Sequence, residues 1–182
     1  MELIETVTVG SGGAASITFS SIPQTYTDLC LLISWRSTAT NAVDLGGFHF
    51  NGDTGANYEF KILVMGGTGA AGSATNSNYL AQYNNWSLVF QVPNSFTANT
   101  FANHSVYLPN YSTTGSYKRV NAEVVTENNS TSSYCQIGAG YWRNNSAINS
   151  INFTSYGGSW VEGSSISLYG ILKGSDGVTT VS

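Results

Sequence analysis

The stretch Leu29-Cys30-Leu31-Leu32-Ile33-Ser34-Trp35-Arg36 decides the fold class. Side chains alternate between the two faces of a β-strand, so every second residue shares a face. One face of this stretch carries Leu29, Leu31, Ile33 and Trp35. The other face is also apolar near its start, which is typical of a strand in the middle of a sheet. The pattern therefore predicts a central strand.

Similar strand signals recur along the chain, separated by clusters of Gly, Asn, Ser and Thr. Further strands are predicted over residues 3–9, 15–19, 43–50, 57–65, 79–91, 100–111, 118–127, 133–143, 147–154 and 164–172. Gly46-Gly47 predicts a bulge. Many strands with short connections predict an all-β, jelly-roll-like β-sandwich of about ten antiparallel strands.

We expect a single domain, because a chain of 182 residues can bury most of its apolar surface in one core. The domain should cover residues 1–173, followed by a polar tail over 174–182. The period-two spacing assigns to the core the four apolar residues of the central strand and six others. These six are Ile17, Phe19, Ile151, Phe153, Ile166 and Leu168.

The chain is nearly free of charge, with six Lys or Arg, ten Asp or Glu and a net charge of −4. Nucleic-acid binding needs basic patches, so no nucleic-acid partner is expected. No apolar run approaches the roughly 20 residues of a membrane helix, so no membrane partner is expected either. Ser, Thr and Asn fill about a third of the chain, which suits a packed, assembled or glycan-facing β-domain.

The two cysteines, Cys30 and Cys135, are expected to be free thiols. The N-terminus shows no signal peptide, because Glu2 and Glu5 are acidic and strand-like alternation begins at Leu3. Without an export signal, two small buried hydrophobes are favoured over a disulfide.

Catalytic groups are scarce, and we expect no enzyme, no catalytic residue and no cofactor. His49 and His104 are the only histidines, and neither stands in an evident triad context. The best carboxylate pair on one strand is Glu123 and Glu127, which four residues of strand would separate by roughly 13 Å. Glycoside hydrolysis needs about 5–9.5 Å between its carboxylates.

Two further arrangements of acidic residues stay open. Carboxylates from different strands could still meet, for instance Asp44 with Glu59 or Glu162. Residues 51–57 alternate oxygen ligands as a calcium loop does, but they lack the second carboxylate and the bidentate Glu. A tight hairpin explains the same residues, because Asn-Gly supplies positive φ. No metal site is therefore assigned.

Carbohydrate binding is the ligand hypothesis that the sequence supports best. Sugars stack on exposed aromatic rings, and amides bond to their hydroxyls. Residues 83–86 and 156–160 each combine aromatic side chains with small polar residues. The candidate glycan-binding residues are Tyr83, Trp86, Tyr156 and Trp160. The competing interpretation is that Trp86 and Trp160 pack over the edge of the sandwich.

Five segments together resemble a family of tailed-bacteriophage virion structural proteins that is common in aquatic phages, including cyanophages. They are VTVGSGGAASITF at 7–19, SIPQTYTDL at 21–29, FNGDTGANY at 50–58, WRNNSAINSI at 142–151 and SISLYGI at 165–171. The resemblance covers residues 3 to 172, and residues 60–100 follow the pattern least. It implies a non-enzymatic component of the virion and carries no catalytic residues.

Such domains occur as decoration proteins and as the ends of tail fibres, and the sequence favours the first role. The first strand is expected to begin at Leu3, which leaves no N-terminal attachment segment for a fibre tip. We therefore expect a capsid cement or decoration protein on the outer surface of the head, assembled in the host cytoplasm. Its expected partners are the major capsid protein or other virion proteins and further copies of itself. The alternative is a tail or tail-fibre module that binds host surface glycans.

Overall fold

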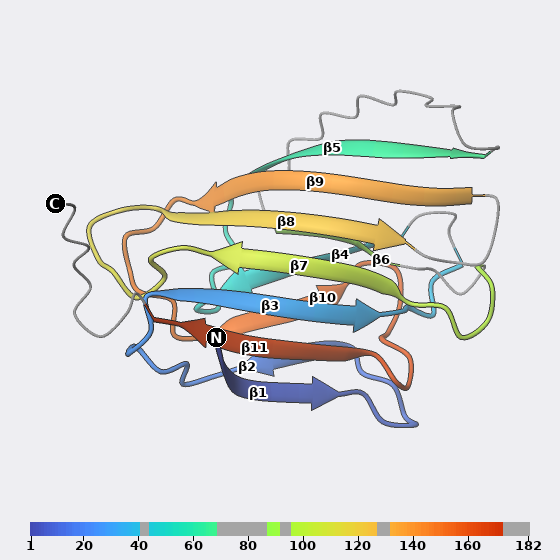
Figure 1. The fold of residues 1–182 in the computed structure, drawn as a ribbon, viewed down its shortest axis with the longest axis horizontal. Coiled ribbons are helices and arrows are strands. Elements are labelled where there is room, and N and C mark those ends of the chain that lie inside the picture. The colour runs from blue at the N-terminus through green and yellow to red at the C-terminus, as the bar shows by residue number, and fades with distance from the viewer. Residues whose placement is uncertain (41–43, 69–86, 92–95, 127–131, 173–182) are drawn as a thin grey trace, which may run out of the picture.

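The eleven strands in the described part of the chain run antiparallel to their neighbours in two sheets (Figure 1). The computed structural model describes residues 1–40, 44–68, 87–91, 96–126 and 132–172. The strands are β1 (Glu2–Thr8), β2 (Ser16–Phe19), β3 (Asp28–Trp35), β4 (Asp44–Phe50), β5 (Tyr58–Thr68), β6 (Ser87–Gln91), β7 (Ala102–Leu108), β8 (Lys118–Thr126), β9 (Ser132–Trp142), β10 (Ile151–Ser155) and β11 (Ser165–Ile171). The described residues include no helix that could cross a membrane.

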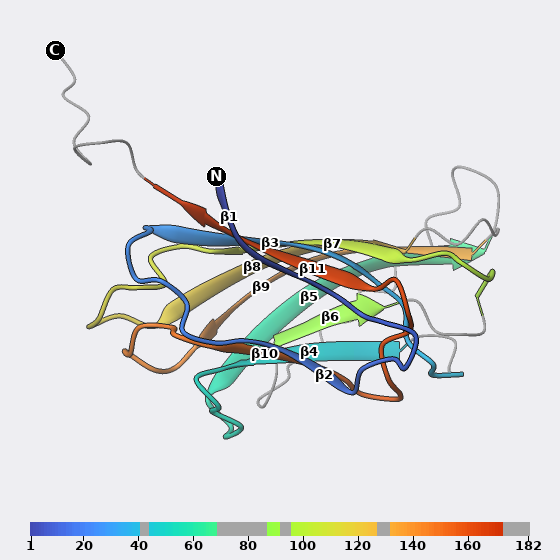
Figure 2. The same cartoon turned by 90° about the horizontal axis from the view of Figure 1, so that it is seen from below.

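The strand order is that of a jelly roll with an enlarged sheet. One sheet has the order β1-β11-β3-β7-β8-β9-β5, and the other has the order β2-β10-β4-β6. If β5, β8 and β9 are set aside, eight strands remain, and successive strands lie mostly in opposite sheets, as in a double-sheet jelly roll. The three extra strands lie together at one side and widen the larger sheet. Figure 2 shows the two layers edge-on.

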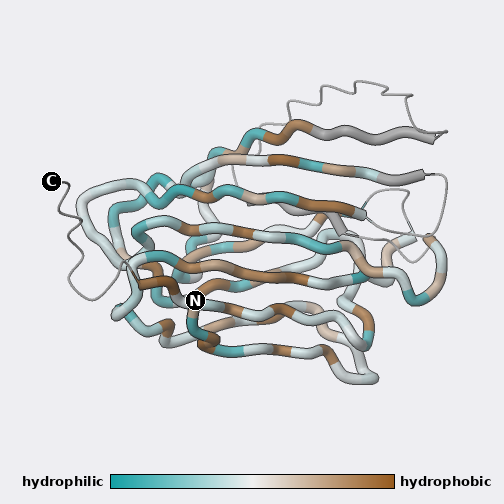
Figure 3. Tube along the Cα trace, viewed as in Figure 1, coloured by the Kyte–Doolittle hydropathy of each residue, from teal (hydrophilic) through white to brown (hydrophobic). Residues whose placement is uncertain are grey.

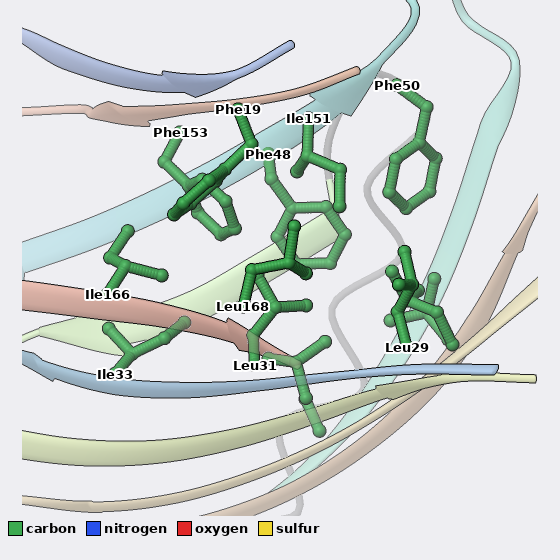
Figure 4. Close-up of a cluster of buried hydrophobic side chains, with 14 of the residues drawn as sticks. Phe19, Leu29, Leu31, Ile33, Phe48, Phe50, Ile151, Phe153, Ile166 and Leu168 are labelled. Atoms are coloured by element: carbon green, nitrogen blue, oxygen red, sulfur yellow. The ribbon is translucent and has the colours of Figure 1, made fainter. Parts of the chain in front are cut away.

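The core lies between the sheets and contains every residue that the sequence assigned to it. Each of the ten predicted core side chains is at most 4% exposed. Figure 4 labels predicted core side chains of β2, β3, β10 and β11, together with Phe48 and Phe50 of β4, which were not predicted. Phe153 packs against Phe19 and Phe48 at ring-centroid distances of 6.3 and 5.5 Å. Aromatic rings therefore fill much of the space between the layers.

β3 occupies the central position that its sequence predicted, between β11 and β7. Its second face is less enclosed than the apolar pattern suggested, because Leu32 is 44% exposed. Buried and more exposed residues also alternate along the next strands of this sheet, β7 and β8. Along β8, every second residue from Lys118 to Thr126 is buried. The outward residues of β3, β7, β8, β9 and β5 thus form an outer face that the smaller sheet does not cover.

Two local predictions for β4 have different outcomes. The bulge at Gly46-Gly47 is wrong: β4 keeps an unbroken register with β10 on one side and β6 on the other, and these two neighbours hold it straight. A register shift occurs instead in β1, between Leu3 and Glu5. The turn after β4 is confirmed, because Asn51 and Gly52 have φ of 53° and 71°, the combination that a two-residue hairpin turn requires.

Strand bounds differ from the prediction mainly where loops are stabilised by tertiary hydrogen bonds. Residues 147–150 do not extend β10, because the Ile148 amide donates to the Tyr111 carbonyl at 2.9 Å. The Asn51 side chain also accepts from the Asn149 amide at 2.9 Å. The predicted strand over 79–91 is described only as β6, and residues 79–86 lie outside the described part. The expected tail over 174–182 also lies outside it.

Candidate functional site

Both histidines are buried, so neither lies on a surface where a substrate could reach it. His104 points inward from β7, and its ring lies 4.8 Å from that of Trp35 in an edge contact. Neither ring nitrogen of His104 has a hydrogen-bond partner, and burial lowers its pKa to about 3. His49 is 5% exposed and contacts the ring of Tyr58. Their environments are those of packed core side chains.

Asp44 and Glu59, one of the pairs that the sequence left open, lie in different sheets. Asp44 is buried on β4, where it accepts a hydrogen bond from the Ser37 hydroxyl at 2.7 Å. Glu59 lies on β5 in the other sheet and accepts a hydrogen bond from the Tyr141 hydroxyl. Glu127 lies outside the described residues. Within the described part of the chain, no three His, Cys, Asp or Glu side chains gather as metal ligands would.

The oxygen-rich loop after β4 is built as a structural turn. The carboxylate of Asp53 accepts from the Gly55 amide at 2.9 Å, from the Asn57 amide group at 2.9 Å and from the indole nitrogen of Trp142 at 2.7 Å. Burial raises the pKa of Asp53, and these hydrogen bonds outweigh it, so the net shift is downward. The donors occupy the carboxylate oxygens that a calcium ion would need. This geometry favours a structural turn over a calcium loop. The expected hairpin is wrong, because the strands on either side of the turn, β4 and β5, belong to different sheets.

Of the four glycan-binding residues proposed from the sequence, the structure describes Tyr156 and Trp160. Trp160 is fully buried and stacks on Trp35 at a centroid distance of 3.8 Å, so its assignment as a sugar platform is wrong. It is held inside because its backbone bridges to Ala14 and Ser37 at the end of the sandwich. Tyr156 follows β10 and is 60% exposed. Tyr83 and Trp86 lie outside the described residues.

The outer face of the larger sheet carries large apolar side chains that solvent reaches. They are Leu32, Leu63, Tyr107, Val125 and Ile137, which are 37–52% exposed. Leu63 and Ile137 are direct cross-strand partners, and Val125 lies diagonally across from Ile137. Figure 3 shows hydrophobic segments on β3, β8, β9 and β5 of this sheet. Exposed apolar groups of this kind mark interaction surfaces when they gather on one face.

A hollow lies at the end of this outer face where β8 begins and β9 ends. It has a volume of about 560 Å³ and is lined by Pro109, Asn110, Ser116, Tyr117, Arg119 and Tyr141. A second hollow of about 280 Å³ shares Arg119 and Tyr141 and extends to Glu59 and Lys61 on β5 and to Asn121 on β8. Tyr117 and Tyr141 are nearly parallel, with an interplanar angle of 11° and a centroid distance of 6.1 Å. We call these two hollows together the Tyr117–Tyr141 hollow.

The sheet register fixes the polar groups around Tyr141. Arg119 is its cross-strand partner on β8, and Glu59 is its partner on β5. Tyr141 donates its hydroxyl hydrogen to the Glu59 carboxylate, and this bond raises the pKa of the phenol. Lys61 lies 3.8 Å from the same carboxylate. Tyr117, which stacks on Tyr141, is 55% exposed.

The hollow leaves no single pattern in the sequence, because its lining comes from β5, β8, β9 and the connection between β7 and β8. Tyr117-Lys118-Arg119 does carry a local signal: it contains the only adjacent basic residues in the chain and begins with an aromatic. The strand alternation places Lys118 inside, where its ammonium donates to the Ser116 carbonyl at 2.7 Å. It leaves Tyr117 and Arg119 outside. Tyr141 and Glu59 join them only through strand pairing.

Comparison with known proteins adds no relative: none of the protein-family models, curated proteins or solved structures matches this chain.

Proposed function

We propose that the chain is a non-enzymatic structural protein of a bacteriophage virion, a cement or decoration protein on the outer surface of the head. The observation that carries the proposal is the outer face of the larger sheet, where five large apolar side chains are 37–52% exposed. The five-segment resemblance to phage virion proteins supports the same role, as does the jelly roll, an architecture that recurs in capsid domains.

The partner is the major capsid protein or another virion protein, and copies of the chain associate on the shell. The charged residues Glu59, Lys61 and Arg119 lie around the hollow at one end of the outer face. Around Leu63, Val125 and Ile137, apolar contacts and hydrogen bonds would hold the face in place. Many copies on a lattice compensate for modest affinity at each contact. Attachment should therefore depend only weakly on salt. The burial of both histidines supports a role without catalysis.

The test is attachment of the purified protein to capsids of its own phage that lack it. Ile137→Asp places a carboxylate in the middle of the outer face and should abolish attachment. Tyr156→Asp makes the same charge change at an exposed side chain just after β10, away from the outer face, and should attach normally. Electron microscopy should find wild-type copies across the capsid lattice. Copies found only at the tail would refute the cement role.

Glycan binding is a second candidate function, and the exposed pair Tyr117 and Tyr141 favours it. Two offset, nearly parallel rings beside hydrogen-bonding side chains form a platform of the kind on which a sugar ring stacks. This candidate corresponds to a tail or tail-fibre module that binds host surface glycans. Saturable binding to glycans that Tyr117→Ala removes, with the fold intact, would support it.

A further inference from the structure

We infer that the Tyr117–Tyr141 hollow is a binding site for an acidic saccharide, a sugar ring that carries a carboxylate. This inference rests on the second candidate function, glycan binding, and adds the class of glycan. The observation behind it is that the exposed basic side chains lie close to Tyr141. Binding of a neutral glycan would not require them.

The exposed basic side chains of the described residues all gather around Tyr141. Arg119 and Lys61 line the hollow. Arg143 is exposed and follows Tyr141 by two residues. Its guanidinium donates to the Ala56 carbonyl at 3.1 Å.

The other two described basic residues are used inside the protein. Arg36 is 5% exposed and donates to the carbonyls of Phe96, Thr97 and Thr100 at 2.8–3.0 Å. Lys118 is 1% exposed and binds a backbone carbonyl. Their charges therefore serve the fold, whereas those of Lys61, Arg119 and Arg143 face solvent at one place.

The net charge of the side chains that line the hollow is therefore positive, whereas the net charge of the whole protein is negative. Its lining contains one carboxylate, that of Glu59, against two cations, Lys61 and Arg119. The carboxylate is already engaged by the Tyr141 hydroxyl. The whole chain has a net charge of −4, so a cationic cluster at a hollow attracts an anion locally.

The aromatic pair shows what kind of anion fits. A small inorganic anion needs donors alone, but Tyr117 offers a half-exposed ring face, and Asn110 and Asn121 add amide groups to the lining. A pyranose ring can stack on the tyrosines while its hydroxyls bond to the amides. Arg119 supplies the planar pair of donors that matches a carboxylate. Stacking and charge together select a uronate-type sugar over a neutral sugar or a free anion.

The experiment is a calorimetric titration of the full chain with a galacturonic acid tetrasaccharide and with its carboxyl-reduced, neutral counterpart. We expect saturable binding of the acidic sugar, weakened by salt, and binding of the neutral sugar at least about tenfold weaker, because a charge-assisted hydrogen bond is lost. Arg119→Gln should remove this preference. Tyr117→Ala should weaken both sugars. Tyr156→Ala removes the exposed tyrosine that the sequence proposed for glycan binding and that lies outside the hollow, and it should change neither affinity. Loss of binding in this variant alone would overturn the hollow as the site.

Each outcome decides one part of the inference. Equal affinity for the two sugars, lost with Tyr117→Ala, would keep glycan binding and overturn the acidic class. Binding unaffected by Tyr117→Ala and Arg119→Gln would overturn the site. The absence of binding to either sugar would overturn glycan binding itself and leave capsid attachment standing. Tighter binding of a single-stranded oligonucleotide at the same residues would reassign the hollow to a different ligand. Chemical unfolding curves would show that each variant is folded.

Discussion

Acidification should destabilise this protein through His104 at pH values where most carboxylates are still ionised. The imidazole lies between the sheets beside Trp35, without a hydrogen-bond partner for either nitrogen. Burial lowers its pKa from 6.5 to about 3, so the folded protein keeps the ring neutral. The unfolded chain binds a proton as the pH falls through 6.5, and the folded chain does not. The stabilisation that comes from keeping His104 neutral is therefore fully present above about pH 6.5. It is lost progressively as the pH falls to about 3.

The magnitude follows from the two pKa values. Each unit of pH between them changes the free energy of unfolding by about 1.4 kcal/mol for one proton. Between pH 7 and pH 5, His104 alone should therefore cost about 2 kcal/mol of stability. This is a large fraction of the roughly 5–15 kcal/mol that stabilises a typical domain.

The assay is urea unfolding of the wild type and of His104→Leu at pH 7 and pH 5, followed by fluorescence of the buried tryptophans. Leucine fills a similar volume and removes the titrating group, whereas the carboxylates titrate identically in both proteins. The wild type should lose about 2 kcal/mol more than the variant over this interval. Equal losses in the two proteins would refute the reasoning, because they would mean that the folded protein protonates His104 as readily as the unfolded chain.

Two further predictions concern packing and redox state. Gly140→Ala should destabilise the fold by about 1–3 kcal/mol, because the new methyl group would lie 2.3 Å from the Glu59 carbonyl oxygen and 2.5 Å from the Phe60 ring. Gly12→Ala, where the methyl meets open space, is the matched control in the same urea assay. Cys30 and Cys135 should both titrate as free thiols in denatured, unreduced protein, and a count of zero with unchanged monomer mass would contradict this. In the folded protein, Cys30 should react slowly with thiol reagents near neutral pH, because burial raises its pKa.

The alternation of residues along each strand was enough to predict which side chains form the core. A strand has one face for odd positions and one for even positions, so Leu29, Leu31 and Ile33 must point the same way whatever their neighbours are. Burying that face is the strongest stabilising contribution available to the chain. The sandwich class and the inward residues of β3, β10 and β11 follow from that local rule alone.

The local sequence pattern could not predict whether an aromatic side chain outside a strand is buried or exposed. Trp160 and Tyr156 occupy the same glycine-rich segment, yet one is fully buried and the other is 60% exposed. The difference arises because the backbone of Trp160 is held to Ala14 and Ser37, which are remote in sequence. Only the packed structure shows that the first ring belongs to the core.

The candidate site depends on strand register, which the sequence does not specify. Nothing in the spacing of Glu59, Arg119 and Tyr141 relates them, since they are 22 to 82 residues apart along the chain. The order β8-β9-β5 and its pairing place them in one row, and a slip of one residue on any strand would turn its side chain inward. The sequence by itself determined that these residues belong to strands of a sandwich. Only the tertiary structure brought them together, because long-range hydrogen bonding between strands sets the register.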